Sequence, residues 1–216
     1  MNDEKKNATG VRGYVLAGGV SRRFGADKAL VEFAGRTLLS RMCELVAATT
    51  GSVHVVVPAG RYSNYGLSLI EDRWPHEGPL GGIITALRAT QEVSGGERWN
   101  LMVGCDMPFL TREWLRYLIA AAVASDGEVV VPRSTYGLEP LCACWRTSAA
   151  TSLQSAFDEG VRKVTDAMKR LRVEILDDTH WKRFDSAGRL FWNMNTPQDY
   201  QAALQMWETS ECERSR

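Results

Sequence analysis

Residues 14–28 read YVLAGGVSRRFGADK, a short apolar run that leads into glycines and cations. The run Tyr14–Ala17 predicts a buried strand. It ends in two glycines, and the cations that follow surround a third, Gly25; these cations are Arg22, Arg23 and Lys28. Glycines let a backbone approach a ligand closely, and successive N–H groups can then point at a phosphate. Two glycines alone favour a tight turn, but the whole stretch predicts an anion-binding loop.

This loop matches neither of two common phosphate-binding patterns. Its spacing is not the G-x-x-x-x-G-K-[ST] of a P-loop, and it lacks the G-x-G-x-x-G of dinucleotide-binding domains. The anion would therefore be held by a different kind of loop.

Strand-like and helix-like segments alternate along the chain. Apolar runs predict strands at 13–17, 53–57, 67–70, 100–105, 128–132, 141–145 and 189–195. Helical spacing predicts helices at 37–49, 83–90 (directly after Gly81 and Gly82), 111–124, 148–160 and 196–207. Continuous apolar strands between helices are typical of a parallel sheet covered on both faces. We expect an α/β fold: a single-domain, Rossmann-like, three-layer domain over 12–208 with a mostly parallel central sheet, between a disordered leader, 1–11, and a disordered tail, 209–216.

Composition excludes some classes of protein. The chain has 216 residues, with 26 Lys and Arg against 26 Asp and Glu. Proteins that bind nucleic acid or a membrane surface carry a basic excess, so we expect neither partner. No apolar run approaches the roughly 18 to 20 residues of a membrane span. The five cysteines are typical of reduced thiols, which predicts a cytoplasmic location. Cys142 and Cys144 would share a strand face, but nothing nearby completes a zinc set.

Polar side chains follow several predicted strands directly. Asp72 comes after 67–70, and Asp106 comes after 100–105. In an open α/β sheet, ligands bind outside the carboxyl ends of the strands, so one edge could collect these carboxylates, Asn195 and the glycine loop. A carboxylate at such an edge can bind Mg²⁺. The alternative is that Asp106 caps the helix beginning near Thr111 or makes a turn.

Two further stretches suit a polar ligand. In GPLGGI, residues 78–83, Pro79 stiffens the loop and two glycines leave N–H groups exposed at a helix start, which suits a flat base or an anion. In NMNTPQD, Asn193 and Asn195 would share one face of a strand. The alternative for these two amides is a capping and turn arrangement.

Taken in order, these stretches resemble one known family. LAGGVSRRFGADKALVEFAGRTLL is similar to the signature of nucleotidyltransferases with a glycosyltransferase-A-like fold. GPLGGI, CDMPFL and NMNTPQDY narrow the resemblance to the molybdenum cofactor guanylyltransferases, over about residues 12–205. The resemblance implies transfer of GMP from GTP to molybdenum-loaded molybdopterin, with release of pyrophosphate. It implies Mg²⁺ as cofactor, and as further partners an upstream molybdenum-insertion enzyme and chaperones of client molybdoenzymes.

The resemblance also implies roles for particular residues. The implied nucleotide contacts are Leu16, Ala17, Gly18, Gly19, Lys28, Asp72, Gly78, Gly82 and Asp106. Lys28 would hold phosphates with the assistance of Arg23, and Asp106 would bind the metal. The implied contacts to the pterin cofactor are Arg162, Lys163, Asn193 and Asn195.

One position departs from the family pattern, and other functions remain open. Pro58 stands where many relatives have Asn, which puts a nucleoside contact there in doubt, and Glu139 receives no role. A cytidylyltransferase for the same pterin, or a nucleotidyltransferase for another phosphorylated cofactor, would share the first loop. A non-catalytic molybdenum cofactor-binding adaptor would keep the Asn193 and Asn195 side and dispense with Lys28 and Asp106.

Overall fold

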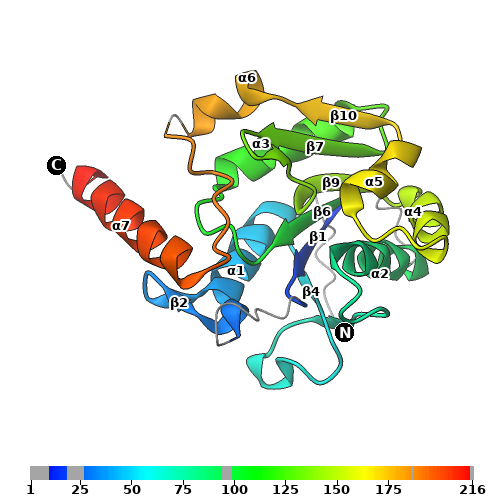
Figure 1. The fold of residues 1–216 in the computed structure, drawn as a ribbon, viewed down its shortest axis with the longest axis horizontal. Coiled ribbons are helices and arrows are strands. Elements are labelled where there is room, and N and C mark those ends of the chain that lie inside the picture. Colours follow the sequence, from blue (N-terminus) through cyan, green and yellow to red (C-terminus); the bar gives the residue numbers. More distant parts are fainter. Residues whose placement is uncertain (1–9, 19–26, 94–98, 186, 215–216) are drawn as a thin grey trace.

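A mixed β-sheet forms the middle layer of the computed structural model, which describes residues 10–18, 27–93, 99–185 and 187–214, without the side chains of 211–214 (Figure 1). The strand order is β10-β7-β9-β6-β1-β4-β5, with β8 paired to β7. The strands are β1 (Val11–Leu16), β4 (His54–Val57), β5 (Leu69–Glu71), β6 (Trp99–Gly104), β7 (Val129–Ser134), β8 (Gly137–Leu138), β9 (Cys142–Arg146) and β10 (Val173–Leu176). A separate small sheet pairs β2 (Glu32–Phe33) with β3 (Arg36–Thr37).

Most strand pairs in this sheet are parallel, as the sequence predicts. β1 is parallel to β4 and β6, β4 to β5, and β10 to β7. β9 is the exception on this path, because it runs antiparallel to both β6 and β7. The apolar composition of Cys142–Arg146 resembles that of the parallel strands, so the sequence pattern could not give its direction.

Helices cover both faces, which confirms the three-layer expectation. The α-helices are α1 (Leu38–Thr50), α2 (Pro79–Glu92), α3 (Arg112–Ala124), α4 (Ala149–Asp158), α5 (Val164–Ala167), α6 (Asp178–Trp181) and α7 (Pro197–Arg214). The 3-10 turns are η1 (Lys28–Leu30), η2 (Ser63–Tyr65), η3 (Met168–Arg170) and η4 (Lys182–Phe184). One buried core contains side chains of α1 and α3, and the other contains side chains of α2 and α4. Burial of these two amphipathic helix pairs against the sheet is the main stabilising term.

The close packing of α1 on β1 depends on Gly13. A Cβ atom at Gly13 would lie 2.4 Å from Thr50 Oγ1, 2.4 Å from Val46 Cγ1 and 2.8 Å from Ser52 O. No side chain fits at these distances. The glycine therefore allows the C-terminal end of α1 to lie directly on the strand that leads to the glycine loop.

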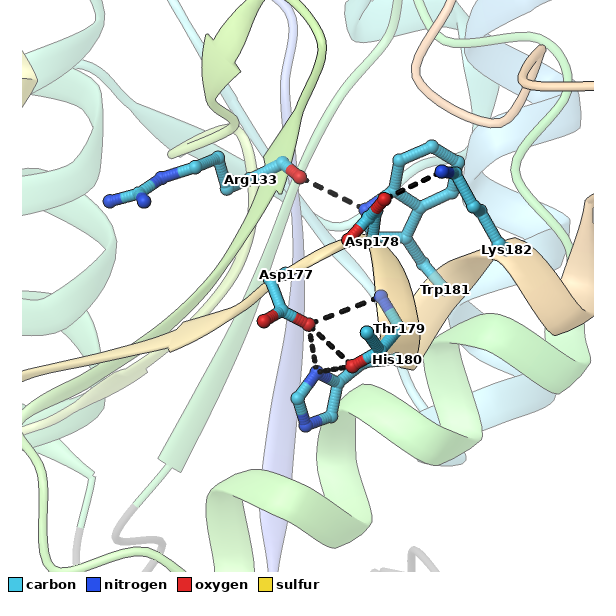
Figure 2. Close-up of polar contacts among 7 residues, drawn as sticks. All are labelled: Arg133, Asp177, Asp178, Thr179, His180, Trp181 and Lys182. Carbon is cyan, nitrogen blue, oxygen red and sulfur yellow. Dashed lines mark hydrogen bonds and ion pairs between the residues drawn. The ribbon is translucent and has the colours of Figure 1, made fainter.

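The segment around α6 ties the chain back to the sheet (Figure 2). Asp177 is the N-cap of α6, and its Oδ1 accepts from the Thr179 N–H at 3.1 Å. Trp181 Nε1 donates to Arg133 O of β7 at 2.9 Å, and Trp181 is 3% exposed. The ring also meets Phe191 edge-on, with centroids 5.4 Å apart. This segment and β10 were not predicted, because such short elements carry too few residues for a periodic pattern.

The predicted strand at 189–195 is wrong. Leu190 and Phe191 lie in a turn, and residues 192–195 have no ladder partner. Asp185 accepts from the Leu190 N–H, and the Met194 N–H donates to Asp106 O at 3.0 Å. The apolar residues that suggested a strand are buried, but in two separate places. Phe191 joins the α3 core, whereas Met194 joins a small cluster with Phe33.

Several predicted boundaries also shift. α2 begins at Pro79, so Gly81 and Gly82 lie inside its first turn and not before it. β5 covers Leu69–Glu71, where 67–70 was expected. β1 begins at Val11, and α7 continues to Arg214, so residue 11 is not leader and residues 209–214 are helical where a disordered tail was expected. Residues 1–9 lie outside the described part of the chain. Thr37 and Thr196 accept hydrogen bonds from Ser40 N and Asp199 N, as N-caps do.

Candidate active site

The carboxyl ends of three strands meet at one edge of the sheet, and the candidate site lies there. Leu16, the last residue of β1, is in register with Gly104, the last residue of β6, and with Val56 of β4. Ligands of open α/β sheets bind at this kind of edge. The sequence predicted that the glycine loop and the acidic residues would meet here, and the register of these strands gives the same edge.

Lys28, Asp106 and Asn195 form a polar cluster at this edge. Lys28 Nζ donates to Asp106 Oδ2 at 2.9 Å and to Asn195 Oδ1 at 3.0 Å. Lys28 is 9% exposed, so its hydrocarbon stem is buried while its amine is held by two oxygens. The three residues come from η1, from the end of β6 and from the segment before α7. They lie far apart in the sequence, and the fold brings them into contact.

The position of Asp106 is fixed by its backbone. The Gly104 N–H donates to Leu141 O at 2.7 Å, and Asp106 O accepts from the Met194 N–H at 3.0 Å. A Cβ atom at Gly104 would lie 2.8 Å from Asp106 Oδ1, so a side chain at this position would displace the carboxylate. The helix cap of α3 is Thr111, which accepts from the Trp114 N–H at 3.2 Å. The alternative in which Asp106 caps α3 is therefore wrong, whereas the alternative in which it makes a turn is correct, because Asp106 lies in a turn directly after β6.

A cavity of about 710 Å³ opens at this cluster. Its lining includes most of the residues that the sequence assigned to a nucleotide: Leu16, Ala17, Gly18, Lys28, Asp72, Gly78, Gly82 and Asp106. Asn195 lines the same cavity. A cavity of this size is within the range of small-molecule sites. Gly19 and Arg23, the other two residues assigned to this side, lie outside the described residues.

Asp72 is a buried carboxylate beside the end of β1. It is 9% exposed, and its Oδ1 accepts from the Trp74 N–H at 3.1 Å and from Thr85 Oγ1 at 3.2 Å. A Cβ atom on Gly18 would lie 3.8 Å from Asp72 Oδ2 and 3.5 Å from Pro58 Cδ. Pro58, the departure from the family pattern, therefore packs beside Gly18 and presents a hydrocarbon surface there.

The N-terminus of α2 forms another wall of the cavity. Gly78 is the residue before the helix, and its φ of +90° is a conformation that other residues rarely adopt. Pro79 occupies the first helical position, where a missing N–H is tolerated. A Cβ atom at Gly81 would lie 3.0 Å from Trp74 Cβ, so this glycine allows close packing and does not open a loop. The free N–H groups of the first turn point out of the helix, as the expected anion or base would require.

The four residues assigned to the pterin cofactor are not brought together. Asn195 lies in the Lys28 cluster, whereas Asn193 donates to Phe191 O at 3.3 Å. Arg162 pairs with Glu77 at 2.6 Å and lies over the Phe157 ring, and Lys163 is exposed at the start of α5. The prediction that Asn193 and Asn195 share a strand face is wrong, because the segment is not a strand. Arg162 lies on the α2 side, where its carbonyl oxygen would be 3.9 Å from a Cβ atom at Gly78.

Glu139 is a buried carboxyl that the sequence left without a role. It is 7% exposed, and Ser134 Oγ donates to its Oε1 at 2.6 Å. It also hydrogen-bonds the Asn193 side chain, and burial, reinforced by the charge of Asp106, raises the pKa of the Glu139 carboxyl. Glu139 thus links the β7–β8 turn to the segment before α7. One acidic residue in a predicted loop gives no sequence signal for such a link.

The donors at the site suit a hard cation better than a soft one. Asp106 supplies one carboxylate, and Mg²⁺ commonly uses one or two with phosphate oxygens and water. In the part of the chain that the structure describes, no group of three His, Cys, Asp or Glu residues could hold a metal. Cys142 and Cys144 are fully buried, and burial raises the pKa of both thiols. Both side chains pack in the buried core.

Known proteins are similar to this chain in both sequence and fold. Residues 13–173 match the family described as MobA-like NTP transferase domain. A probable molybdenum cofactor guanylyltransferase from Chloroflexus aggregans is 32% identical over 195 residues, which cover 87% of this chain and 90% of the relative. One from Pelotomaculum thermopropionicum is 31% identical over 205 residues, which cover 94% of this chain and 96% of the relative.

A solved structure agrees with these relatives. Molybdopterin-guanine dinucleotide biosynthesis protein A from Archaeoglobus fulgidus superposes with a TM-score of 0.80 and 28% identity. The match covers 92% of this chain and 99% of that one. No helix among the described residues is long and apolar enough to cross a membrane. The chain belongs to the family of MobA-like NTP transferase domains.

Proposed function

We propose that this chain transfers GMP from GTP to molybdenum-loaded molybdopterin, forming the guanine dinucleotide cofactor and pyrophosphate. Two of the relatives named above are described as probable molybdenum cofactor guanylyltransferases, and the third as a molybdopterin-guanine dinucleotide biosynthesis protein. The observation that carries the proposal is the Lys28–Asp106 pair at the strand-end cavity. A non-catalytic adaptor would have no need of this pair, so the enzyme is the better-supported function.

The proposed reaction forms one bond and breaks one. An oxygen of the acceptor's terminal phosphate bonds to the α-phosphorus of GTP. The bond from that phosphorus to the oxygen bridging the β-phosphate breaks, and pyrophosphate leaves with the electron pair. The attacking phosphate is already an anion near neutral pH, so no general base is required. The protein's task is to position both substrates and to offset negative charge.

The cavity residues fit these tasks. Backbone groups of Leu16, Ala17 and Gly18, continued by Gly19, would approach the nucleotide closely, and Asp72 would lie at the nucleoside. Gly78 and Gly82 would leave room for the base or for phosphate at the start of α2. Lys28 would hold the phosphates, with Arg23 assisting. Before substrate binds, Asp106 and Asn195 hold the Lys28 amine at the cavity wall, which keeps it oriented.

Nucleotidyltransferases of this kind typically use a divalent metal, and we propose Mg²⁺ at Asp106. When bound there, the ion would offset negative charge on the triphosphate and on the leaving pyrophosphate. Asn195, which already meets Lys28, would face the acceptor phosphate. Arg162 and Lys163 would bind the acceptor if the acceptor extends to the α2 side of the cavity. Asn193 would contribute through its hydrogen bond to Glu139, which attaches the segment before α7.

The proposal extends to location and partners. The described cysteines at 43, 105, 142 and 144 are all free thiols, which supports a cytoplasmic location. As further partners we propose an upstream enzyme that inserts molybdenum and the chaperones of client molybdoenzymes.

Incubation with four nucleoside triphosphates tests the proposed function. Each triphosphate carries a radiolabelled α-phosphorus and is incubated with Mg²⁺ and molybdenum-loaded cofactor. We expect labelled dinucleotide with GTP, and at most a small fraction of that yield with ATP, CTP or UTP. Product with CTP alone would instead establish the cytidylyltransferase. No product with any triphosphate would contradict the proposed reaction.

A further inference from the structure

The carboxylate of Asp27 binds groups from two separate segments. Asp27 directly precedes Lys28 and is the N-cap of η1, where its Oδ1 accepts from the Ala29 N–H at 3.2 Å. The hydroxyl of Tyr62 lies 2.9 Å from Oδ1 and 2.8 Å from Oδ2. Arg61 Nη2 donates to Oδ2 at 2.5 Å. The backbone turn that carries Lys28 is therefore attached to the loop after β4.

Tyr62 is held in an uncommon conformation to make this contact. Its φ of 58° and ψ of 20° are in the left-handed region, which disfavours a residue with a bulky side chain. It is 7% exposed, and its ring meets that of Tyr65 edge-on with centroids 5.9 Å apart. The Arg61 guanidinium lies 5.2 Å from the Tyr62 ring centroid. Such a conformation persists only where surrounding contacts fix it, and these contacts include both carboxylate oxygens of Asp27.

The same loop also meets the other end of the glycine loop. Pro58 packs 3.5 Å from where a Cβ atom of Gly18 would be, and Pro58 O accepts from the Arg61 N–H at 3.3 Å. Gly18 and Asp27 are the described residues on either side of the segment 19–26. The loop from Pro58 to Tyr62 therefore contacts the chain on both sides of that segment.

We propose that Tyr62 is a positioning residue that acts, with Arg61, through Asp27 on Lys28. η1 is a single 3-10 turn of three residues, so few contacts of its own fix its backbone. Asp106 and Asn195 hold the Lys28 amine. The Tyr62 hydroxyl and the Arg61 guanidinium fix, through Asp27, the backbone from which that side chain extends. The proposal rests on the proposed role of Lys28 in binding phosphate.

Tyr62→Phe removes the hydroxyl and keeps the ring contacts. Because a displacement of about 1 Å at a catalytic group can lower turnover by 10²-fold, we expect kcat to fall by roughly 10-fold. We expect the KM for GTP to change by less than about threefold, since the other cavity contacts remain. Tyr65→Phe is the matched control, because Tyr65 is 52% exposed and lies on the same loop. It should leave kcat unchanged.

A double-mutant cycle with Lys28→Ala separates positioning from general loop stability. If Tyr62 acts through Lys28, Tyr62→Phe should have almost no further effect on kcat in the Lys28→Ala protein. An equal fall in both backgrounds, or no fall in either, would overturn the positioning role. A fully active Lys28→Ala protein would refute the proposed role of Lys28 and the Tyr62 proposal with it. An inactive Lys28→Ala protein with a fully active Tyr62→Phe protein would refute only the positioning role of Tyr62.

Should Tyr62→Phe fail to fold, Asp27 provides a second comparison. Asp27→Asn keeps an acceptor for the Ala29 N–H and the Tyr62 hydroxyl, whereas Asp27→Ala removes both. At equal thermal midpoints, we expect Asp27→Asn to retain at least 5-fold more kcat than Asp27→Ala. Equal kcat in these two folded variants would overturn the proposal.

Discussion

The properties of Lys28 follow from its surroundings. A lysine that is 9% exposed needs partners for its charge, and it has Asp106 and Asn195. These partners keep the amine at the cavity wall. A cation held at the wall of a phosphate site offsets charge without having to be ordered during the reaction.

Lys28→Ala should therefore lower turnover far more than stability. Loss of one positioned contact to the transition state typically lowers kcat by about 10²- to 10³-fold. The measurement is dinucleotide formation at saturating GTP, together with the thermal midpoint. Lys169→Ala is the control, because Lys169 is a surface side chain, 76% exposed, that pairs with Asp166. Normal turnover in a folded Lys28→Ala protein would contradict the phosphate role.

Single residues show how far the sequence leads. The motif GADK and the position of Asp106 after an apolar strand predicted that both side chains would lie at one sheet edge, and they are in contact. The sequence placed Asn195 at this edge because it predicted a strand over 189–195, which is wrong. The contact of Asn195 with Lys28 depends instead on the backbone hydrogen bond from Met194 to Asp106. The hydroxyl of Tyr62 gave no signal, because its role depends on a loop conformation that is uncommon for tyrosine.

At the scale of elements, the crossing of α1 over β1 sets the start of the glycine loop. Thr50 Oγ1 and Val46 Cγ1 would each lie 2.4 Å from a Cβ atom at Gly13, and Ser52 O would lie 2.8 Å from it. The backbone of β1 cannot move away, because it pairs with β4 on one side and β6 on the other. Strand and helix are thus fixed together.

Gly13→Ala should destabilise the protein by about 1–3 kcal/mol, as overpacking of a close contact does. Gly82→Ala is the matched control, because its nearest neighbour, Leu16 Cδ2, would be at an ordinary 3.7 Å. Alanine at this helical position should raise stability by about 0.5–1 kcal/mol. Urea unfolding of both variants gives the comparison. A Gly13→Ala protein as stable as wild type would contradict the packing of α1 on β1.

The elements also show why some predictions fail. The helices with several apolar residues at regular spacing, α1, α3 and α4, were predicted almost to the residue. The run 189–195 looked like a strand because its large apolar residues are buried. Their burial comes from two separate cores, and hydrophobic pattern alone cannot distinguish that from one strand.

At the scale of the whole molecule, the family resemblance is confirmed by the match over residues 13–173 and by a structural relative at a TM-score of 0.80. The mostly parallel sheet and the helices on both faces follow from the alternation of apolar and amphipathic runs. The reversed direction of β9 does not, since it is set by its pairing with β6 and β7.

The stability of the whole molecule should depend on His54 in mildly acidic solution. Burial, together with the charge of Arg12, lowers the pKa of His54 from 6.5 to about 4. Between these values the unfolded chain binds more protons than the folded one, so the free energy of unfolding falls as pH falls. His54→Gln should remove this contribution, which is on the order of 1–2 kcal/mol for a half-buried group. Urea unfolding of both proteins at pH 7 and pH 4.5 measures it. An equal change in the free energy of unfolding of the two proteins would contradict the assignment of this pH dependence to His54.

The Mg²⁺ dependence of turnover tests the proposed site most directly. Asp106→Asn keeps the size of the side chain and removes the charge that would hold the metal. We expect it to remain folded, to lose most of the dependence on Mg²⁺ and to lower turnover by on the order of 10²-fold. Asp126→Asn, at an exposed position after α3, is the control. The measurement is dinucleotide formation from GTP against Mg²⁺ concentration for the three proteins. Parallel curves of similar height for wild type and Asp106→Asn would contradict the account.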